Sequence, residues 1–201
     1  MKKLKSLFIF FAITQSLAYA DYNDVYIADI QYDWIDKSYV EKQVVIDEIR
    51  DIIFKDGEIS KNKDLKKNFK DFVQDKEYRK HYIAASAGLK EYENYNISAF
   101  YYKNQKHIYM YALQDKQDLS KIFYYDALGN LRYIDFIQGE FPDYPYYAIQ
   151  YRVSGKPVSA VYNVSKDTQY LYNPDTSFKG VWYKHNLYDE NSKIILKRTT
   201  Y

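Results

Sequence analysis

The stretch that decides the fold is FYYDALGNLRYIDF, residues 123–136, in which two runs of alternating apolar and aromatic residues flank Gly129-Asn130. Alternation with a period of two is typical of a half-buried β-strand. Two such runs around a Gly-Asn pair predict a hairpin, because glycine reaches the backbone conformations of tight turns without steric penalty. We therefore expect strands on both sides of a turn between Tyr125 and Leu131.

The spacing of this hairpin recurs along the chain: a Tyr, a small residue four positions later, and an apolar residue or Pro six positions later. The copies are Tyr125/Gly129/Leu131, Tyr151/Gly155/Pro157, Tyr172/Thr176/Phe178 and Tyr188/Ser192/Ile194, with Tyr102/Lys106/Ile108 as a loose earlier copy. We expect the small residue to occupy the turn and the Tyr to pair across the strands with the apolar position, which would fix the register. The uneven steps between copies do not fit a rigid solenoid.

Other runs with a period of two fill the chain after Asn94. They cover 97–102, 107–113, 121–126, 131–137, 147–153, 158–164, 168–172, 178–184 and 193–198. All four Pro lie beyond residue 141, at loops or strand starts where no ladder donor is needed. Residues 94–201 are therefore predicted to form an antiparallel meander of about eight or nine strands.

Residues 21–93 have a helical pattern instead. Apolar residues recur at helical spacing in two stripes, Val45/Ile49/Ile52/Ile53 and Leu65/Phe69/Phe72/Val73, and a new face starts with Tyr78, Tyr82, Ala85 and Leu89. Ser38 and Glu41 have the spacing of a capping box, and the second stripe fails near Asp75, where we expect a break. The predicted fold class is α+β, with two or three N-terminal helices packed on the meander.

The first twenty residues have the features of a secretory signal peptide. Lys2, Lys3 and Lys5 precede an apolar run from Leu7 to Ile13, and Ala18-Tyr19-Ala20 has the small-x-small pattern of a cleavage site. The apolar run is too short for a membrane span. We expect export from a bacterial cell, to the periplasm, cell surface or medium, without membrane insertion after cleavage.

Composition excludes several classes of function. The chain has no Cys, which excludes disulfides, thiol nucleophiles and thiolate metal sites. Without the three leader lysines, 26 basic residues face 27 acidic ones, so the charge gives no reason to expect a nucleic-acid partner. The 26 Tyr favour strands and half-buried surfaces.

Tyr125-Asp126-Ala127-Leu128-Gly129-Asn130-Leu131 resembles the YD repeat of RHS-type cell-surface proteins, and Tyr188-Asp189 echoes it. In that family many copies build a large β shell, and the repeats are linked to carbohydrate binding. The copies in this chain are too few to close such a shell. The signal peptide, helices and Tyr-rich meander are also similar to those of uncharacterised secreted bacterial proteins. No catalytic residue follows from either resemblance.

Few residue patterns point to catalysis. The three histidines, His81, His107 and His185, have no metal-ligand spacing, and we expect neither a metal site nor a cofactor. Asp126 and Asp135 form the one conceivable carboxylate pair for glycoside hydrolysis, although Asp is first of all a turn former.

The segment Phe141-Pro-Asp-Tyr-Pro-Tyr-Tyr147 concentrates rings and Pro in a long connection of the meander. Rigid rings supply contact area at a low entropic cost. Together with Trp182 and Tyr183, the rings of Phe141, Tyr144, Tyr146 and Tyr147 are candidates for an aromatic platform that binds a glycan or a protein. The alternative is a structural role, in which these rings pack against the sheet.

The sequence thus favours an exported, non-enzymatic binding or interaction module at the cell envelope. The alternative is a small cell-envelope glycan hydrolase that uses paired carboxylates.

Overall fold

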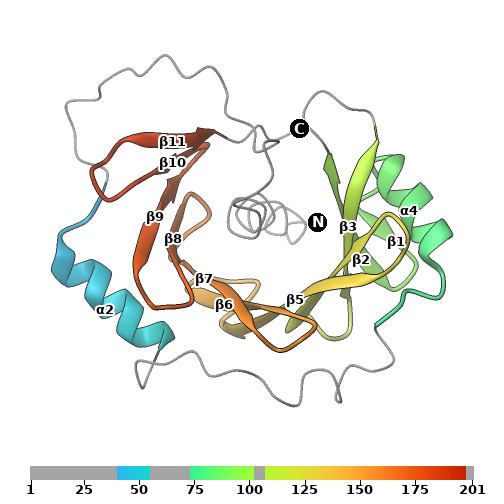
Figure 1. The fold of residues 1–201 in the computed structure, drawn as a ribbon, viewed down its shortest axis with the longest axis horizontal. Coiled ribbons are helices and arrows are strands. Elements are labelled where there is room, and N and C mark those ends of the chain that lie inside the picture. Colours follow the sequence, from blue (N-terminus) through green and yellow to red (C-terminus); the bar gives the residue numbers. More distant parts are fainter. Residues whose placement is uncertain (1–39, 55–72, 102–106, 198–201) are drawn as a thin grey trace. The chain divides into compact units, whose positions relative to one another are not determined.

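A computed structural model describes residues 40–54, 73–101 and 107–197 of the chain (Figure 1). Their elements, in order, are α2 (Gln43–Ile53), α4 (Tyr78–Ser86), β1 (Glu91–Tyr92), β2 (Tyr95–Tyr101), β3 (Ile108–Asp115), β4 (Lys121–Asp126), β5 (Leu131–Gly139), β6 (Tyr146–Arg152), β7 (Pro157–Asn163), β8 (Thr168–Tyr172), β9 (Phe178–Tyr183), β10 (Asn186–Tyr188) and β11 (Ile194–Lys197). The strands follow one another in the sheet in sequence order, β1 to β11.

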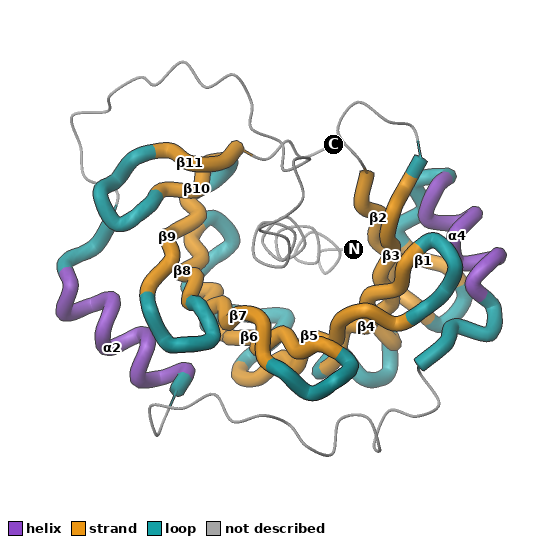
Figure 2. The backbone as a smooth tube through the Cα atoms, viewed as in Figure 1, coloured by secondary structure: helices purple, strands orange, loops and turns teal. Residues whose placement is uncertain are grey.

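The predicted α+β class is wrong. The described chain has eleven strands and two short helices, of 11 and 9 residues, so the protein is nearly all-β (Figure 2). Strand structure already begins at Glu91. The segment near Gln74, assigned to a helical region, instead forms a bridge to Asn130 in the turn of the β4–β5 hairpin. Most of the predicted second helix lies outside the described residues, as do residues 1–39.

The predicted strands are confirmed with small shifts at their ends. Two were missed, β1 and β10, which have only two and three residues and are too short to show a period. None of the described helices has the length and apolar character needed to cross a membrane.

The repeated turns are confirmed, and they share one geometry. The small residue has a positive φ in every copy: Gly129 79°, Gly155 81°, Thr176 70° and Ser192 62°. In each copy, the residue after the Tyr donates its N–H to the carbonyl four positions on, and the small residue donates back to that residue's carbonyl, over 2.7–3.0 Å. The four copies therefore adopt the same type of turn although their residues differ.

Cross-strand pairing of the repeated Tyr is also confirmed in three copies. Tyr125 pairs with Leu131, Tyr172 with Phe178 and Tyr188 with Ile194, each next to a register shift in the ladder. The loose copy differs, because Tyr101, not Tyr102, pairs with Ile108. Residues 102–106 lie outside the described ranges.

The chain divides into two compact units. We call Lys61–Ile137 with Ile149–Pro157 the middle unit, and Met1–Ser60 with Gln138–Ala148 and Val158–Tyr201 the terminal unit. Strand pairs within each unit are antiparallel. We describe each unit separately.

In the middle unit, α4 packs on one face of β2–β5. Ala84 and Ala85 of the helix join a buried cluster with Ile97, Tyr111, Leu113, Phe123, Tyr125, Leu131 and Ile134. The segment before the helix is fixed to the β4–β5 turn, since Asp75 N donates to Gly129 O over 2.9 Å and Leu131 N donates to Val73 O over 3.0 Å. The predicted break near Asp75 is therefore real, because α4 begins only at Tyr78.

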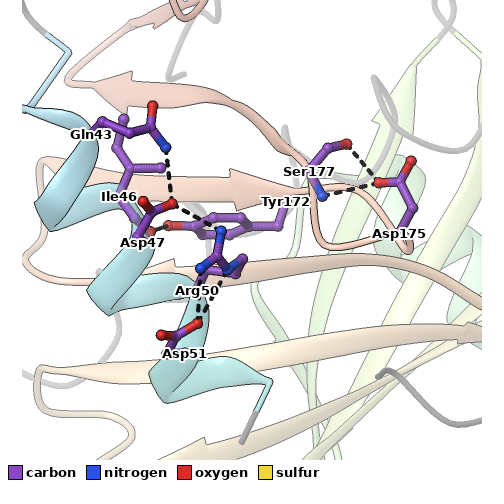
Figure 3. Close-up of polar contacts among 8 residues, drawn as sticks. All are labelled: Gln43, Ile46, Asp47, Arg50, Asp51, Tyr172, Asp175 and Ser177. Atoms are coloured by element: carbon purple, nitrogen blue, oxygen red, sulfur yellow. Dashed lines mark hydrogen bonds and ion pairs between the residues drawn. The ribbon is translucent and has the colours of Figure 1, made fainter. Parts of the chain in front are cut away.

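In the terminal unit, α2 packs on β8. Tyr172 donates its hydroxyl to the carbonyl of Ile46 over 2.7 Å (Figure 3), and its ring meets Phe54 edge-on at 6.0 Å. The predicted stripe was partly wrong in phase: Ile46, Ile49 and Ile53 are buried, whereas Ile52 is 46% exposed. Tyr172, far away in the sequence, contacts Ile46 and Phe54, both of which are buried.

Candidate functional site

The predicted ring segment forms a compact cluster at the connection between β5 and β6. The rings of Phe141 and Tyr146 meet edge-on with centroids 4.9 Å apart, and Tyr144 stacks on Tyr146 at 5.4 Å with 30° between the planes. Tyr146 is 1% exposed, while Phe141 and Tyr144 are half-buried. A buried ring thus supports two rings that reach solvent. We call Phe141, Tyr144 and Tyr146 the ring cluster.

Backbone contacts hold the connection that carries the ring cluster. Asp143 N donates to Glu140 O over 2.8 Å, and Glu140 N donates to Pro145 O over 3.3 Å. Gly139 has φ of 99°, and a Cβ there would lie 3.1 Å from Pro145 O, so this position requires glycine. The peptide bonds Phe141-Pro142 and Tyr144-Pro145 are both cis.

Exposed polar residues lie along the same connection as the two accessible rings. The carboxylate-bearing residues Glu140 and Asp143 are exposed. Tyr147, half-buried, donates its hydroxyl to Gln138 Oε1 over 2.6 Å, which orients the Gln138 side chain. The surface therefore offers apolar ring faces beside carboxylates and an amide.

The other predicted platform residues are placed differently. Trp182 is 0% exposed, in the ladder between Gln169 of β8 and Leu187 of β10, so its ring does not reach solvent. Tyr183 is half-buried, with the Lys184 ammonium 5.2 Å from its ring centroid. Of the six predicted rings, Phe141, Tyr144 and Tyr147 combine partial exposure with a place in the β5–β6 segment.

The conceivable catalytic pair, Asp126 and Asp135, lies on two neighbouring strands, and only one of its members is accessible, because Asp135 is completely buried. Asp135 lies opposite Ile122, four residues before Asp126 on β4, which puts the two Cα atoms at least about 13 Å apart at ~3.3 Å per residue. Carboxylate pairs that hydrolyse glycosides are about 5 to 9.5 Å apart.

The two carboxylates have separate structural tasks. Asp126 Oδ1 accepts the N–H groups of Leu128 and Asn130, both over 2.9 Å. Asp189 makes the same pair of contacts with Asn191 and Lys193 in its own turn. The Asp of the Tyr-Asp pair is therefore a turn-capping residue.

Asp135, in contrast, is completely buried and accepts a hydrogen bond from the Tyr124 hydroxyl. Burial raises the pKa of its carboxyl to about 7, against the opposing effect of that hydrogen bond. A carboxyl without access to solvent cannot reach an external substrate directly.

A second buried polar group was missed by the sequence analysis. Asp75 Oδ2 accepts a hydrogen bond from the Tyr111 hydroxyl over 2.6 Å and lies 2.7 Å from His81 Nδ1, while Oδ1 accepts the N–H of Glu77 over 3.0 Å. Burial raises the pKa of Asp75, but the hydrogen bonds from His81 and Tyr111 outweigh it, so the pKa lies below its usual range. We call these three residues the Asp75 network.

The Asp75 network joins elements that are distant in the sequence. His81 comes from α4 and Tyr111 from β3, and the His81 ring is enclosed edge-on by Tyr92 at 5.8 Å and Tyr95 at 5.4 Å. With His81 only 3% exposed, the His-Asp pair is positioned to hold the helix on the sheet. The only feature of the sequence that pointed to this network is the end, near Asp75, of the run of apolar residues at helical spacing.

Across the ranges that the structure describes, no three His, Asp or Glu side chains converge as ligands of a metal ion. Comparison with known proteins adds no relative: no family model, no curated protein and no solved structure matches the chain.

Proposed function

We propose that the chain is an exported, non-enzymatic binding module that uses the ring cluster and the polar residues beside it to hold a glycan or protein at the cell envelope. The single observation that carries the proposal is the exposure of Phe141 and Tyr144, half-buried in contact with a fully buried Tyr146. Rings fixed by a buried neighbour lose little entropy when they bind.

The polar residues beside the ring cluster, Gln138, Glu140 and Asp143, support a ligand with both apolar and hydroxyl surfaces. The exposed carboxylates of Glu140 and Asp143 accept hydrogen bonds, and Gln138, held by Tyr147, carries an amide at the same connection. Ring faces pack on apolar patches, and the polar groups fix orientation. The hydrolase alternative has no such support, because Asp135 of its named pair is completely buried and Asp126 caps a turn.

Binding to purified peptidoglycan sacculi and to an immobilised glycan panel tests the proposal. We expect retention of the purified protein on at least one of these, and loss of retention in Tyr144→Ala and Phe141→Ala. Leu128→Ala is the matched control, since Leu128 is an apolar residue 68% exposed in another turn. Retention that survives both ring substitutions would remove the ring cluster from the proposal.

A protein ligand is the other outcome of the same test. If glycans do not bind, crosslinking of the purified protein to components of an envelope extract tests for a protein partner. The crosslinked product should form with the wild type and be lost with Tyr144→Ala. The absence of any binding that depends on Phe141 or Tyr144 overturns the proposal.

Export is the second part of the proposal, and it rests on the leader pattern of residues 1–20. We expect the mature chain to begin at Asp21. Mass spectrometry of the N-terminal peptide from bacterially expressed protein measures this; a retained Met1 would contradict it.

A further inference from the structure

The two most exposed large apolar side chains of the described residues lie on α4 and on the turn that packs against it. Ile83 of α4 is 66% exposed, and Leu128 of the β4–β5 turn is 68% exposed. Val73, which precedes the helix, is 40% exposed. Scattered apolar residues are common on protein surfaces, but a group of them around one helix indicates an interaction surface.

Close contacts connect the turn and the segment before the helix with α4. A Cβ on Gly129, the neighbour of Leu128, would overlap the Cβ of Tyr78 at the start of α4. On the same hairpin, Leu131 N donates to Val73 O over 3.0 Å. Val73 and Leu128 are therefore held next to the first turn of α4.

The outer side of α4 continues this surface. Ala84 and Ala85 are buried against the sheet. Arg79 and Ile83 are exposed, and because they are four residues apart they are neighbours on one face of the helix. Arg79 Nε donates to the Tyr78 hydroxyl over 3.2 Å, and its guanidinium carbon lies 5.8 Å from the centroid of that ring. Tyr78 therefore connects Arg79 with the β4–β5 turn.

Basic side chains outnumber acidic ones around these apolar residues. The charged residues that reach solvent on α4, on the segment before it and at the β4–β5 turn are Lys76, Glu77, Arg79, Lys80, Asp126 and Arg132. Lys80 pairs with Glu77 over 2.6 Å, and Arg132 lies 4.0 Å from Asp126. Lys76 and Arg79 form no ion pair within the described ranges. Four basic residues against two acidic ones leave an excess of two positive charges.

We call Val73, Lys76, Arg79, Ile83 and Leu128 the α4 surface. We propose that the α4 surface docks on a membrane of anionic phospholipid and holds the protein there peripherally. Its positive charges are complementary to the lipid phosphates, and its apolar side chains enter the boundary between head groups and acyl chains. A free phosphate ion would pair with the basic residues but would leave the apolar side chains in water.

Co-sedimentation with lipid vesicles tests the proposal on the protein purified after export. We expect binding to vesicles that contain phosphatidylglycerol, little binding to vesicles of phosphatidylcholine alone, and weaker binding as salt is added. Ile83→Asp and Leu128→Asp should each weaken binding about tenfold or more, because a carboxylate replaces a side chain that enters the lipid. Both side chains are exposed, so the substitutions leave the core unchanged.

Neutral substitutions test the basic residues. Lys76→Gln and Arg79→Gln should each weaken binding about fivefold, which corresponds to the ~1 kcal/mol that one basic residue contributes near an anionic membrane. Inorganic phosphate should release no more protein from the vesicles than sodium chloride of the same ionic strength. Greater release by phosphate would mean that the surface binds single phosphate groups, and it would overturn the proposal.

Val44→Asp is the matched control. Val44 is 58% exposed on α2, in the terminal unit, and the substitution introduces the same charge. This variant should bind the vesicles like the wild type. Equal losses in Val44→Asp and Ile83→Asp overturn the proposal, as does a wild type that does not bind phosphatidylglycerol. Binding that is indifferent to Ile83→Asp and Leu128→Asp, as binding through an uncleaved leader would be, also overturns it.

This test is separate from the test of glycan or protein binding, because the ring cluster belongs to the terminal unit and the α4 surface to the middle unit. Tyr144→Ala should bind the vesicles like the wild type, and Ile83→Asp should keep any retention on glycans. Loss of vesicle binding in Tyr144→Ala would assign the membrane contact to the ring cluster and overturn the proposal.

Discussion

At the scale of single residues, the most unusual group is the carboxyl of Asp135. It is fully buried, it accepts a hydrogen bond from Tyr124, and its pKa is raised to about 7. In the unfolded chain an Asp titrates near 3.9. Between these two values the folded protein holds a proton that the unfolded chain releases, so stability falls as pH rises.

Asp135→Asn should remove this dependence. Below about pH 4 both states of the wild type are protonated at this site, and the free energy of unfolding has its full contribution. As the pH rises from about 4 to 7 the wild type loses up to ~4 kcal/mol, at ~1.4 kcal/mol per pH unit, while the variant does not. Urea unfolding of both proteins at pH 5 and pH 8 measures the difference; parallel profiles would contradict the assignment.

At the scale of elements, the repeated hairpin turn is the unit that the chain uses four times. A left-handed residue closes each turn, and two copies use Gly where two use Thr or Ser. Gly129 has an additional reason to be glycine, because a Cβ at this position would overlap the Cβ of Tyr78 at the start of α4. The β4–β5 turn is therefore also the docking point of a helix.

Gly129→Ala should be more destabilising than Gly88→Ala. Both residues have positive φ, 79° and 75°, but a Cβ on Gly88 would meet nothing within 4 Å. The strained backbone conformation costs about 1–2 kcal/mol in each variant. Overlap with Tyr78 adds about 1–3 kcal/mol in Gly129→Ala alone. Chemical denaturation of the two variants gives the comparison, and equal losses would mean that Tyr78 moves aside without cost.

At the scale of the whole molecule, each unit fixes its own helix with a tyrosine hydroxyl. Tyr111 donates to Asp75 in the middle unit, and Tyr172 donates to the carbonyl of Ile46 in the terminal unit. Both rings are 0% exposed. A buried acceptor that loses its donor costs about 1–3 kcal/mol, more when it is charged.

Tyr111→Phe and Tyr172→Phe should therefore loosen different helices. We expect faster amide hydrogen exchange in α4 and residues 73–77 for Tyr111→Phe, and in α2 for Tyr172→Phe, because local opening follows the lost contact. Hydrogen exchange read by mass spectrometry resolves these peptides. Faster exchange throughout both units in either variant would show that the units do not open separately.

The sequence by itself determined the strands, their turns and the pairing of the repeated Tyr, because a period of two and a left-handed turn residue are local properties of the chain. The sequence also determined that Phe141, Tyr144 and Tyr146 lie close together, since all three belong to one short connection. The tertiary structure decided the class of the fold, the buried face of α2, the burial of Trp182 and the Asp75 network. Each of these depends on contacts between residues far apart in the sequence, such as Tyr172 with Ile46 and Tyr111 with Asp75, which no local pattern contains.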